Sequence, residues 1–175
     1  MLLFFGFVIA GVVLQRLVEL LIAVRNARYI RSKGGYEVGA RHYKYIVLLH
    51  FLFFLSLLFE VVGKGSAMVL PSWWAIPFSL FLITQGLRYW CIRSLGKRWN
   101  TRIFILPGEA PIKRGPYRFI RHPNYVVVSL ELLLLPLTFS AVATALAFSL
   151  LNAWLLLHIR IPMEEASIYD GHRES

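Results

Sequence analysis

Long apolar runs separated by basic segments constrain the fold of this chain more than any other feature. A helix needs about 20 mostly apolar residues to cross the hydrocarbon core of a bilayer. Runs of about this length cover residues 2–24, 45–62 and 72–92, and a longer run extends from about 125 to 158. Polar and proline residues near 136–140 divide the last run. We therefore expect an all-α integral membrane protein of about five transmembrane helices, the last two forming a hairpin over 126–137 and 141–158.

Composition supports this interpretation. Of the 175 residues, 58% are hydrophobic and only 16% are charged, whereas about a quarter are charged in typical soluble domains. The first run is longer than a signal-peptide core and no basic residue precedes it, so we interpret it as a retained helix. We expect one membrane domain, with three helices in residues 1–92 and a loop, the hairpin and a tail in 93–175.

The distribution of basic residues predicts the topology. The formal net charge is +10, and the Lys and Arg residues concentrate in 25–44, in 93–121 and in the tail, while Lys64 stands alone between the second and third runs. Loops rich in Lys and Arg usually face the cytoplasm. We therefore expect the N-terminus outside and the C-terminus and the long loop in the cytoplasm. Basic loops against an anionic leaflet also explain the charge without a nucleic-acid partner.

The segment RGPYRFIRHPNY, residues 114–125, is a candidate binding site. The glycines and prolines of the 93–121 loop predict a folded cap on the bundle rather than a helix. Pro123 suits the first turn of the next helix, with His122 at its N-cap, and the free N–H groups there favour a negative or electron-rich ligand. The alternative is a basic juxtamembrane stop with aromatic anchors.

Charged residues inside the predicted spans are costly and usually face the bundle interior. Arg16 and Glu19 lie three positions apart in the first span and can pair with each other. Arg88 lies near a span end, where its long side chain can extend to the interface. Glu131 lies deeper in the hairpin, and we expect it to face a cavity and contact substrate.

The stretch HIRIPMEE, residues 158–165, places Arg160 and Glu164 four positions apart, although Pro162 between them disfavours a continuous helix. The doublet formed by Glu164 and Glu165 is notable in a chain with few acidic residues. The histidines do not cluster at metal-ligand spacing, and the single Cys91 excludes an intramolecular disulfide; we expect no metal site.

Together, these motifs resemble the isoprenylcysteine carboxyl methyltransferase family. The resemblance covers residues 93–168 through SLGKRWNTRIFILPGEAPIKR, GPYRFIRHPNY and, after the hairpin, RIPMEE. The stretch RLVELLIAVRNARYIRSKGGYEVGARHYKYIVLLH, residues 16–50, is similar to a bacterial branch of which some members methylate alkylpyrones. One departure is Val127, where family members often have glycine.

The resemblance implies an S-adenosylmethionine-dependent enzyme that releases S-adenosylhomocysteine. The implied cofactor residues are Ile112, Tyr117, His122, Pro123, Asn124, Tyr125 and Glu164. Arg160 would face the acceptor oxygen and serve as the catalytic residue. The expected reaction is methyl transfer to a carboxylate or acidic hydroxyl oxygen of a lipophilic, isoprenylcysteine-like or alkylpyrone-like substrate.

Other functions are compatible with parts of the pattern. Phospholipid N-methyltransferases and nicotinamide-dependent membrane reductases carry related C-terminal segments. A scaffold or transporter is a further class, although transporters usually show inverted repeats, and none is visible in the sequence. Binding of S-adenosylhomocysteine but not NADPH would separate the methyltransferase from the reductase.

Overall fold

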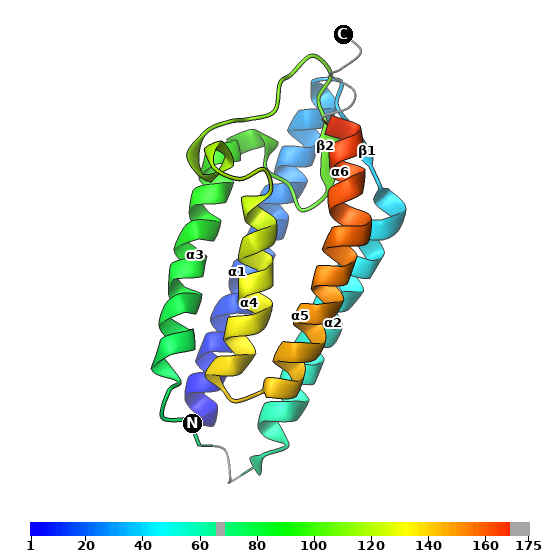
Figure 1. Ribbon diagram of the computed structural model, residues 1–175. Coiled ribbons are helices and arrows are strands. Elements are labelled where there is room, and N and C mark those ends of the chain that lie inside the picture. The colour runs from blue at the N-terminus through cyan, green and yellow to red at the C-terminus, as the bar shows by residue number, and fades with distance from the viewer. Residues whose placement is uncertain (66–68, 169–175) are drawn as a thin grey trace.

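The computed structural model describes residues 1–65 and 69–168, and within them five long helices form an elongated bundle (Figure 1). The helices are α1 (Leu2–Ser32), α2 (Ala40–Val62), α3 (Ala75–Leu95), α4 (Pro123–Thr138) and α5 (Val142–Leu155), the last continuing through η4 (Leu156–Arg160) into α6 (Ile161–Ile168). The all-α prediction is confirmed. The predicted tail beyond residue 168 lies outside the described residues.

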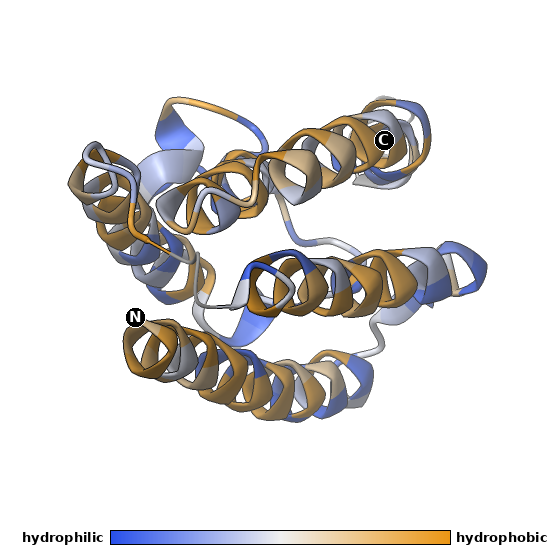
Figure 2. Ribbon diagram, turned by 90° about the horizontal axis from the view of Figure 1, so that it is seen from below, coloured by the Kyte–Doolittle hydropathy of each residue, from blue (hydrophilic) through white to orange (hydrophobic). Residues whose placement is uncertain are grey.

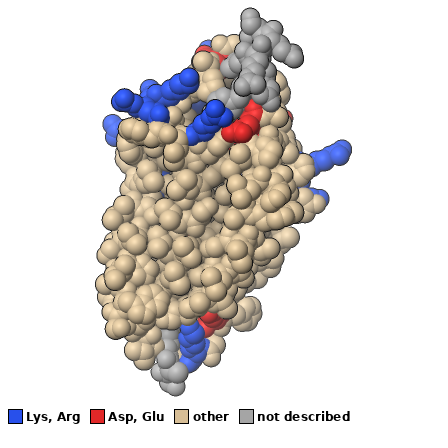
Figure 3. Space-filling view, viewed as in Figure 1, with Lys and Arg blue, Asp and Glu red and all other residues tan. Residues whose placement is uncertain are grey.

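The bundle has the surface of an integral membrane protein. Among the described residues, α1, α2 and the continuous helix Val142–Ser167 are long and apolar enough to cross a bilayer. Figure 3 shows a broad band without charged side chains between two ends that carry Lys, Arg and acidic groups. As predicted, the first arm of the hairpin is short, since α4 has only 16 residues.

The helices pack around α4, which lies between α3 and α5, while α2 packs against α5. In the view along the bundle axis (Figure 2), hydrophobic residues predominate on the helices around its whole circumference, as expected for a protein that faces lipid outside and its own core inside. One group of fully buried apolar side chains lies toward the hairpin turn and includes Leu57, Val61, Leu135, Phe139 and Ala141. This core sets the position of α4, whose other end carries the candidate site.

α1 extends eight residues beyond the predicted span end at residue 24, and this extension anchors the long loop. The buried Asn26 amide donates hydrogen bonds to the carbonyls of Gly96 at 3.1 Å and Trp99 at 2.7 Å. Asn100 returns a bond to the Ala23 carbonyl at 2.8 Å. Trp99 lies near a predicted span end, as interfacial aromatic residues often do, but its side chain is 1% exposed and therefore buried.

The loop between α3 and α4 caps one end of the bundle, as predicted (Figure 1). It contains the short 3-10 helices η2 (Gly96–Arg98) and η3 (Gly115–Arg118) and the strand β2 (Ile103–Ile105), which pairs antiparallel with β1 (Tyr36–Val38). Gly115 has φ +58°, and a Cβ there would lie 2.0 Å from Ser94 Oγ. A side chain would therefore push η3 away from α3.

The C-terminal helix differs from the prediction at Pro162. Instead of a break, the chain forms the π-helical turn η4 and continues into α6. A proline ring clashes with the carbonyl four residues earlier, here that of His158, and a π turn opens the helix at that point. Because of this wider turn, the helix continues past Pro162 instead of breaking. The turn also determines the direction in which the α6 side chains point.

Candidate functional site

The first turn of α4 is built as the sequence predicts. His122 is the N-cap residue and Pro123 occupies the first turn, where its missing N–H breaks no helical hydrogen bond. Val127 is fully buried and packs inside the bundle. The start of α4 therefore lies at the capped end of the bundle with its N–H groups directed toward the loop.

The two motifs that are distant in sequence meet at this end. The Tyr125 hydroxyl donates to a Glu164 carboxylate oxygen, and Arg160 Nε donates to the same hydroxyl at 3.0 Å. Arg160 Nη2 also donates to the Thr101 carbonyl at 2.8 Å. Arg160 is only 7% exposed, so its charge is held in a largely dry position by two oriented bonds. Thr101 was not among the residues predicted from the sequence.

The second acidic residue of the doublet faces His122. His122 Nε2 lies 3.2 Å from Glu165 Oε1, and Nδ1 lies 3.8 Å from Glu164 Oε2. The His122 and Tyr125 rings stack with centroids 5.3 Å apart and planes at 14°. Both carboxylates are thereby held beside the start of α4 while remaining partly exposed. This arrangement offers acceptors to a ligand that carries an ammonium, a sulfonium or hydroxyl groups.

Three other predicted site residues lie between Ile112 and the first turn of α4 along the chain. Asn124 Oδ1 is buried and has no hydrogen-bond partner among the described residues, as expected of an acceptor that a ligand would satisfy. The Tyr117 hydroxyl bonds with the Cys91 thiol, and burial raises the pKa of this hydroxyl above its ordinary value. Ile112 is half-buried in the segment leading into η3.

A second polar centre lies deeper in the bundle. Glu131 accepts bonds from Arg16 at 2.7 Å, from Gln85 at 2.9 Å and from Arg88 Nε at 2.8 Å. Glu19 accepts from Arg16 at 2.6 Å and from Arg88 at 3.0 Å. We call Arg16, Glu19, Arg88 and Glu131 the ion quartet. Arg88 is 5% exposed, so the prediction that it extends to the interface was wrong. The predicted pairing of Arg16 with Glu19 is confirmed.

The ion quartet is separate from the site at the helix start. Glu131 lies eight residues after Pro123, or about 12 Å along α4 at 1.5 Å per residue. Its carboxylate lines a small cavity but is already held by donors from α1 and α3. The structure thus does not bring Glu131 together with Arg160, and its contact with substrate stays a prediction.

An apolar groove adjoins the site at the helix start. It has a volume of about 520 Å³ and is lined by Ala40, Tyr43, Lys44, Val47, Leu48, Phe51 and Arg102. The Arg102 guanidinium lies over the Tyr43 ring, 4.3 Å from its centroid, and the Tyr43 hydroxyl bonds with Thr101 Oγ1 at 3.2 Å. Thr101 in turn accepts from Arg160. Thr101 is therefore the residue that connects the groove with the buried Arg160.

Comparison with known proteins identifies the family of this chain. A Bacillus subtilis (strain 168) protein, YpbQ, is 41% identical over 95% of this chain and 97% of its own length, and a Haemophilus influenzae protein is 26% identical over 95% of each; both are described as uncharacterized. No solved structure matches the chain. The model of the isoprenylcysteine carboxyl methyltransferase family matches residues 75–170, which include the loop, the hairpin and both motifs. The chain therefore belongs to the isoprenylcysteine carboxyl methyltransferase family and is a membrane methyltransferase.

Proposed function

We propose that this membrane methyltransferase uses S-adenosylmethionine to methylate a carboxylate or acidic hydroxyl oxygen of a lipophilic substrate. The observation that carries the proposal is the meeting of the two motifs, in which the Tyr125 hydroxyl lies between Glu164 and Arg160. The family match supports methyl transfer, and the chemistry of these side chains supports the cofactor and the acceptor class.

The residues at the start of α4 fit the proposed cofactor. S-Adenosylmethionine supplies an activated methyl group on a sulfonium. Glu164 and Glu165 offer carboxylates to its ammonium or ribose hydroxyls, and Asn124 offers a buried acceptor that has no partner among the described residues. His122 and Tyr125 offer stacked ring faces to the adenosyl group. Tyr117, Pro123 and Ile112 would complete the wall of the site.

Arg160 is the residue we assign to the acceptor oxygen. A guanidinium has five N–H donors, and the bonds to Tyr125 and Thr101 use two of them. The remaining donors can orient an anionic oxygen toward the methyl group. An ionised carboxylate or acidic enol needs no general base, so positioning and electrostatics can supply most of the catalysis.

The groove beside Arg160 supports a lipophilic acceptor. Its volume lies within the range of about 300–1,000 Å³ typical of ligand sites, which are mostly apolar with a few polar groups. The apolar floor of Val47, Leu48 and Phe51 suits a hydrocarbon tail. Lys44 and Arg102 line the same groove and would attract an anionic head toward Arg160. We infer that the active site faces the cytoplasm, because the loop that covers it is strongly basic.

Calorimetric titration of the full-length protein in detergent tests the cofactor. We expect S-adenosylhomocysteine to bind with a micromolar Kd and NADPH not to bind. Glu164→Gln should weaken binding about tenfold or more, because it removes a charged acceptor. Glu109→Gln is the control, since Glu109 lies in the loop between α3 and α4 with a 58% exposed side chain, and it should leave the Kd unchanged. Binding of NADPH alone would favour the reductase class, and binding of neither ligand would contradict the proposal.

A second assay separates the acceptor role from the cofactor role. Arg160→Ala should retain S-adenosylhomocysteine binding and lose transfer of a labelled methyl group into a lipid extract. Loss of cofactor binding in Arg160→Ala would move this residue into the cofactor site. A labelled product that is a phospholipid amine would favour the N-methyltransferase alternative.

A further inference from the structure

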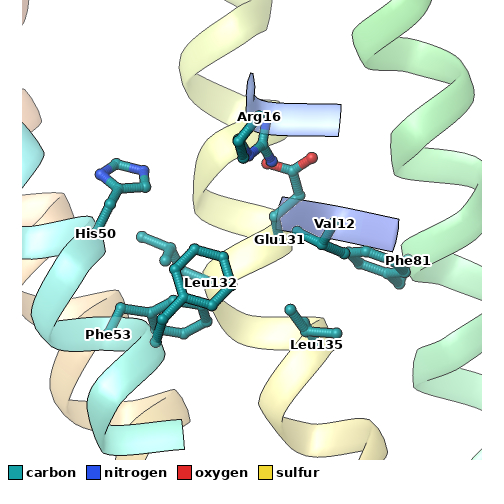
Figure 4. A pocket seen from close by; sticks show the side chains of 9 residues that line it. Val12, Arg16, His50, Phe53, Phe81, Glu131, Leu132 and Leu135 are labelled. Atoms are coloured by element: carbon teal, nitrogen blue, oxygen red, sulfur yellow. The ribbon is translucent and has the colours of Figure 1, made fainter. Parts of the chain in front are cut away.

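A small cavity lies inside the bundle beside the ion quartet. Its volume is about 20 Å³, and Arg16, His50 and Glu131 form its polar side, while its apolar side consists of Val12, Phe53, Phe54, Phe81, Leu132 and Leu135. Figure 4 shows the His50 ring extending from α2 toward Arg16, with Glu131 beside it on α4. The cavity therefore separates polar groups that come from three different helices.

The hydrogen bond of His50 determines what its ring presents to the cavity. Nδ1 lies 2.8 Å from the Ile46 carbonyl oxygen, and because a carbonyl only accepts, Nδ1 must carry the proton. A second proton would add positive charge beside Arg16 in a largely apolar surrounding, so the neutral ring is favoured. Nε2 of the neutral ring is then an acceptor that requires an O–H or N–H donor.

We propose that this cavity is a binding site for one water molecule that links His50 on α2 to the ion quartet. A cavity needs at least about 10–15 Å³ of such volume and two to four polar partners to hold a water. The volume of about 20 Å³ meets the first condition for one molecule. Nε2 as acceptor and the Arg16 guanidinium as donor meet the second, because Arg16 keeps N–H groups beyond those that it donates to Glu19 and Glu131.

The water links α2 to the ion quartet. The ion quartet connects α1, α3 and α4, and no member of it lies on α2. His50 is the residue by which α2 reaches this centre. The same stretch of α2 carries Val47, Leu48 and Phe51 of the groove, so the water would help to fix the helix on which the proposed substrate tail lies.

Filling the cavity tests the proposal by the sign of a stability change. Val12→Leu adds one methylene to the lining without altering a polar group. If the cavity holds water, the substitution displaces it and leaves Nε2 without a donor, so the Tm should fall by about 2–10 °C. If the cavity is dry, the added methylene fills apolar space and the Tm should rise. Val13→Leu is the matched control. The Val13 side chain follows Val12 in the sequence, is 39% exposed and does not line the cavity, so the Tm of this variant should not change.

A density map that resolves ordered waters provides the second measurement, because overpacking alone could also lower the Tm. We expect a peak about 2.7–3.2 Å from His50 Nε2 in the full-length wild-type protein and its loss in Val12→Leu. A rise in the Tm of Val12→Leu, or a wild-type map without a peak in the cavity, would overturn the proposal.

Discussion

Replacing Glu131 of the ion quartet alone should destabilise the protein far more than replacing Glu131 and Arg88 together. Glu131 accepts four hydrogen bonds, two from Arg88 and one each from Arg16 and Gln85. Glu131→Leu leaves two arginines facing one carboxylate, Glu19, in positions that are almost completely buried apart from Arg16. Breaking a buried pair in this way costs about 3–5 kcal/mol.

The double variant Arg88→Met/Glu131→Leu provides the decisive comparison. It restores neutrality, because Arg16 and Glu19 remain as a pair 2.6 Å apart. Replacing a whole buried pair with apolar residues is often close to neutral. We therefore expect the double variant to be at least about 2 kcal/mol more stable than the sum of the single losses predicts.

Reversible unfolding in mixed micelles would measure the four free energies of the cycle. Arg31→Met serves as a control, since Arg31 pairs with Glu37 at 3.2 Å but has a 56% exposed side chain. That substitution should change the unfolding free energy by less than about 1 kcal/mol. Additive losses within about 0.5 kcal/mol in the cycle would refute the coupling of the quartet.

Three further substitutions test the loop and the groove. Gly115→Ala should displace η3 and weaken cofactor binding in calorimetry, because its Cβ would lie 2.0 Å from a serine oxygen at a φ of +58°. Asn26→Ala should lower the unfolding free energy by about 1–3 kcal/mol in mixed micelles, since it leaves two loop carbonyls without their donor. Lys44→Ala/Arg102→Ala should raise the KM for an acidic lipophilic acceptor with little change in kcat, whereas Arg41→Ala, outside the groove lining, should not.

The sequence predicts those parts of the fold that depend on local pattern. Apolar runs locate the helices, and Pro123 locates the start of α4 because its preference is a property of one residue and its neighbours. The π turn before Pro162 was missed because a proline pattern predicts a disturbed helix but does not say whether the helix breaks or widens. The β1–β2 pair could not be predicted, because it depends on contacts between distant segments. The length of α1 was underestimated for the same reason, since Asn26 is stabilised by loop carbonyls some 70 positions away.

The candidate site likewise combines features that the sequence pattern predicts with features that depend on contacts between distant segments. Resemblance to a family identifies the residues of two motifs, but it does not state which side chains touch. That Tyr125 lies between Arg160 and Glu164, and that Thr101 orients the arginine, follows only from the fold. Arg88 illustrates the limit: its position near a span end suggested a side chain that extends to the interface, whereas two carboxylates on other helices hold it inside the bundle.

The shortness of α4 has a consequence for where the reaction takes place. Sixteen residues extend about 24 Å, whereas the hydrocarbon core of a bilayer is about 30 Å thick. If the far end of α4 lies level with the opposite boundary of the hydrocarbon core, its start, and with it the proposed methylation site, lies several ångströms beneath the headgroups. An acidic amphiphile would lose its charge while still immersed, and the neutral ester or ether could diffuse away laterally without crossing into water. Turnover should then depend on acyl-chain length in reconstituted vesicles, because thicker bilayers bury the entrance more deeply.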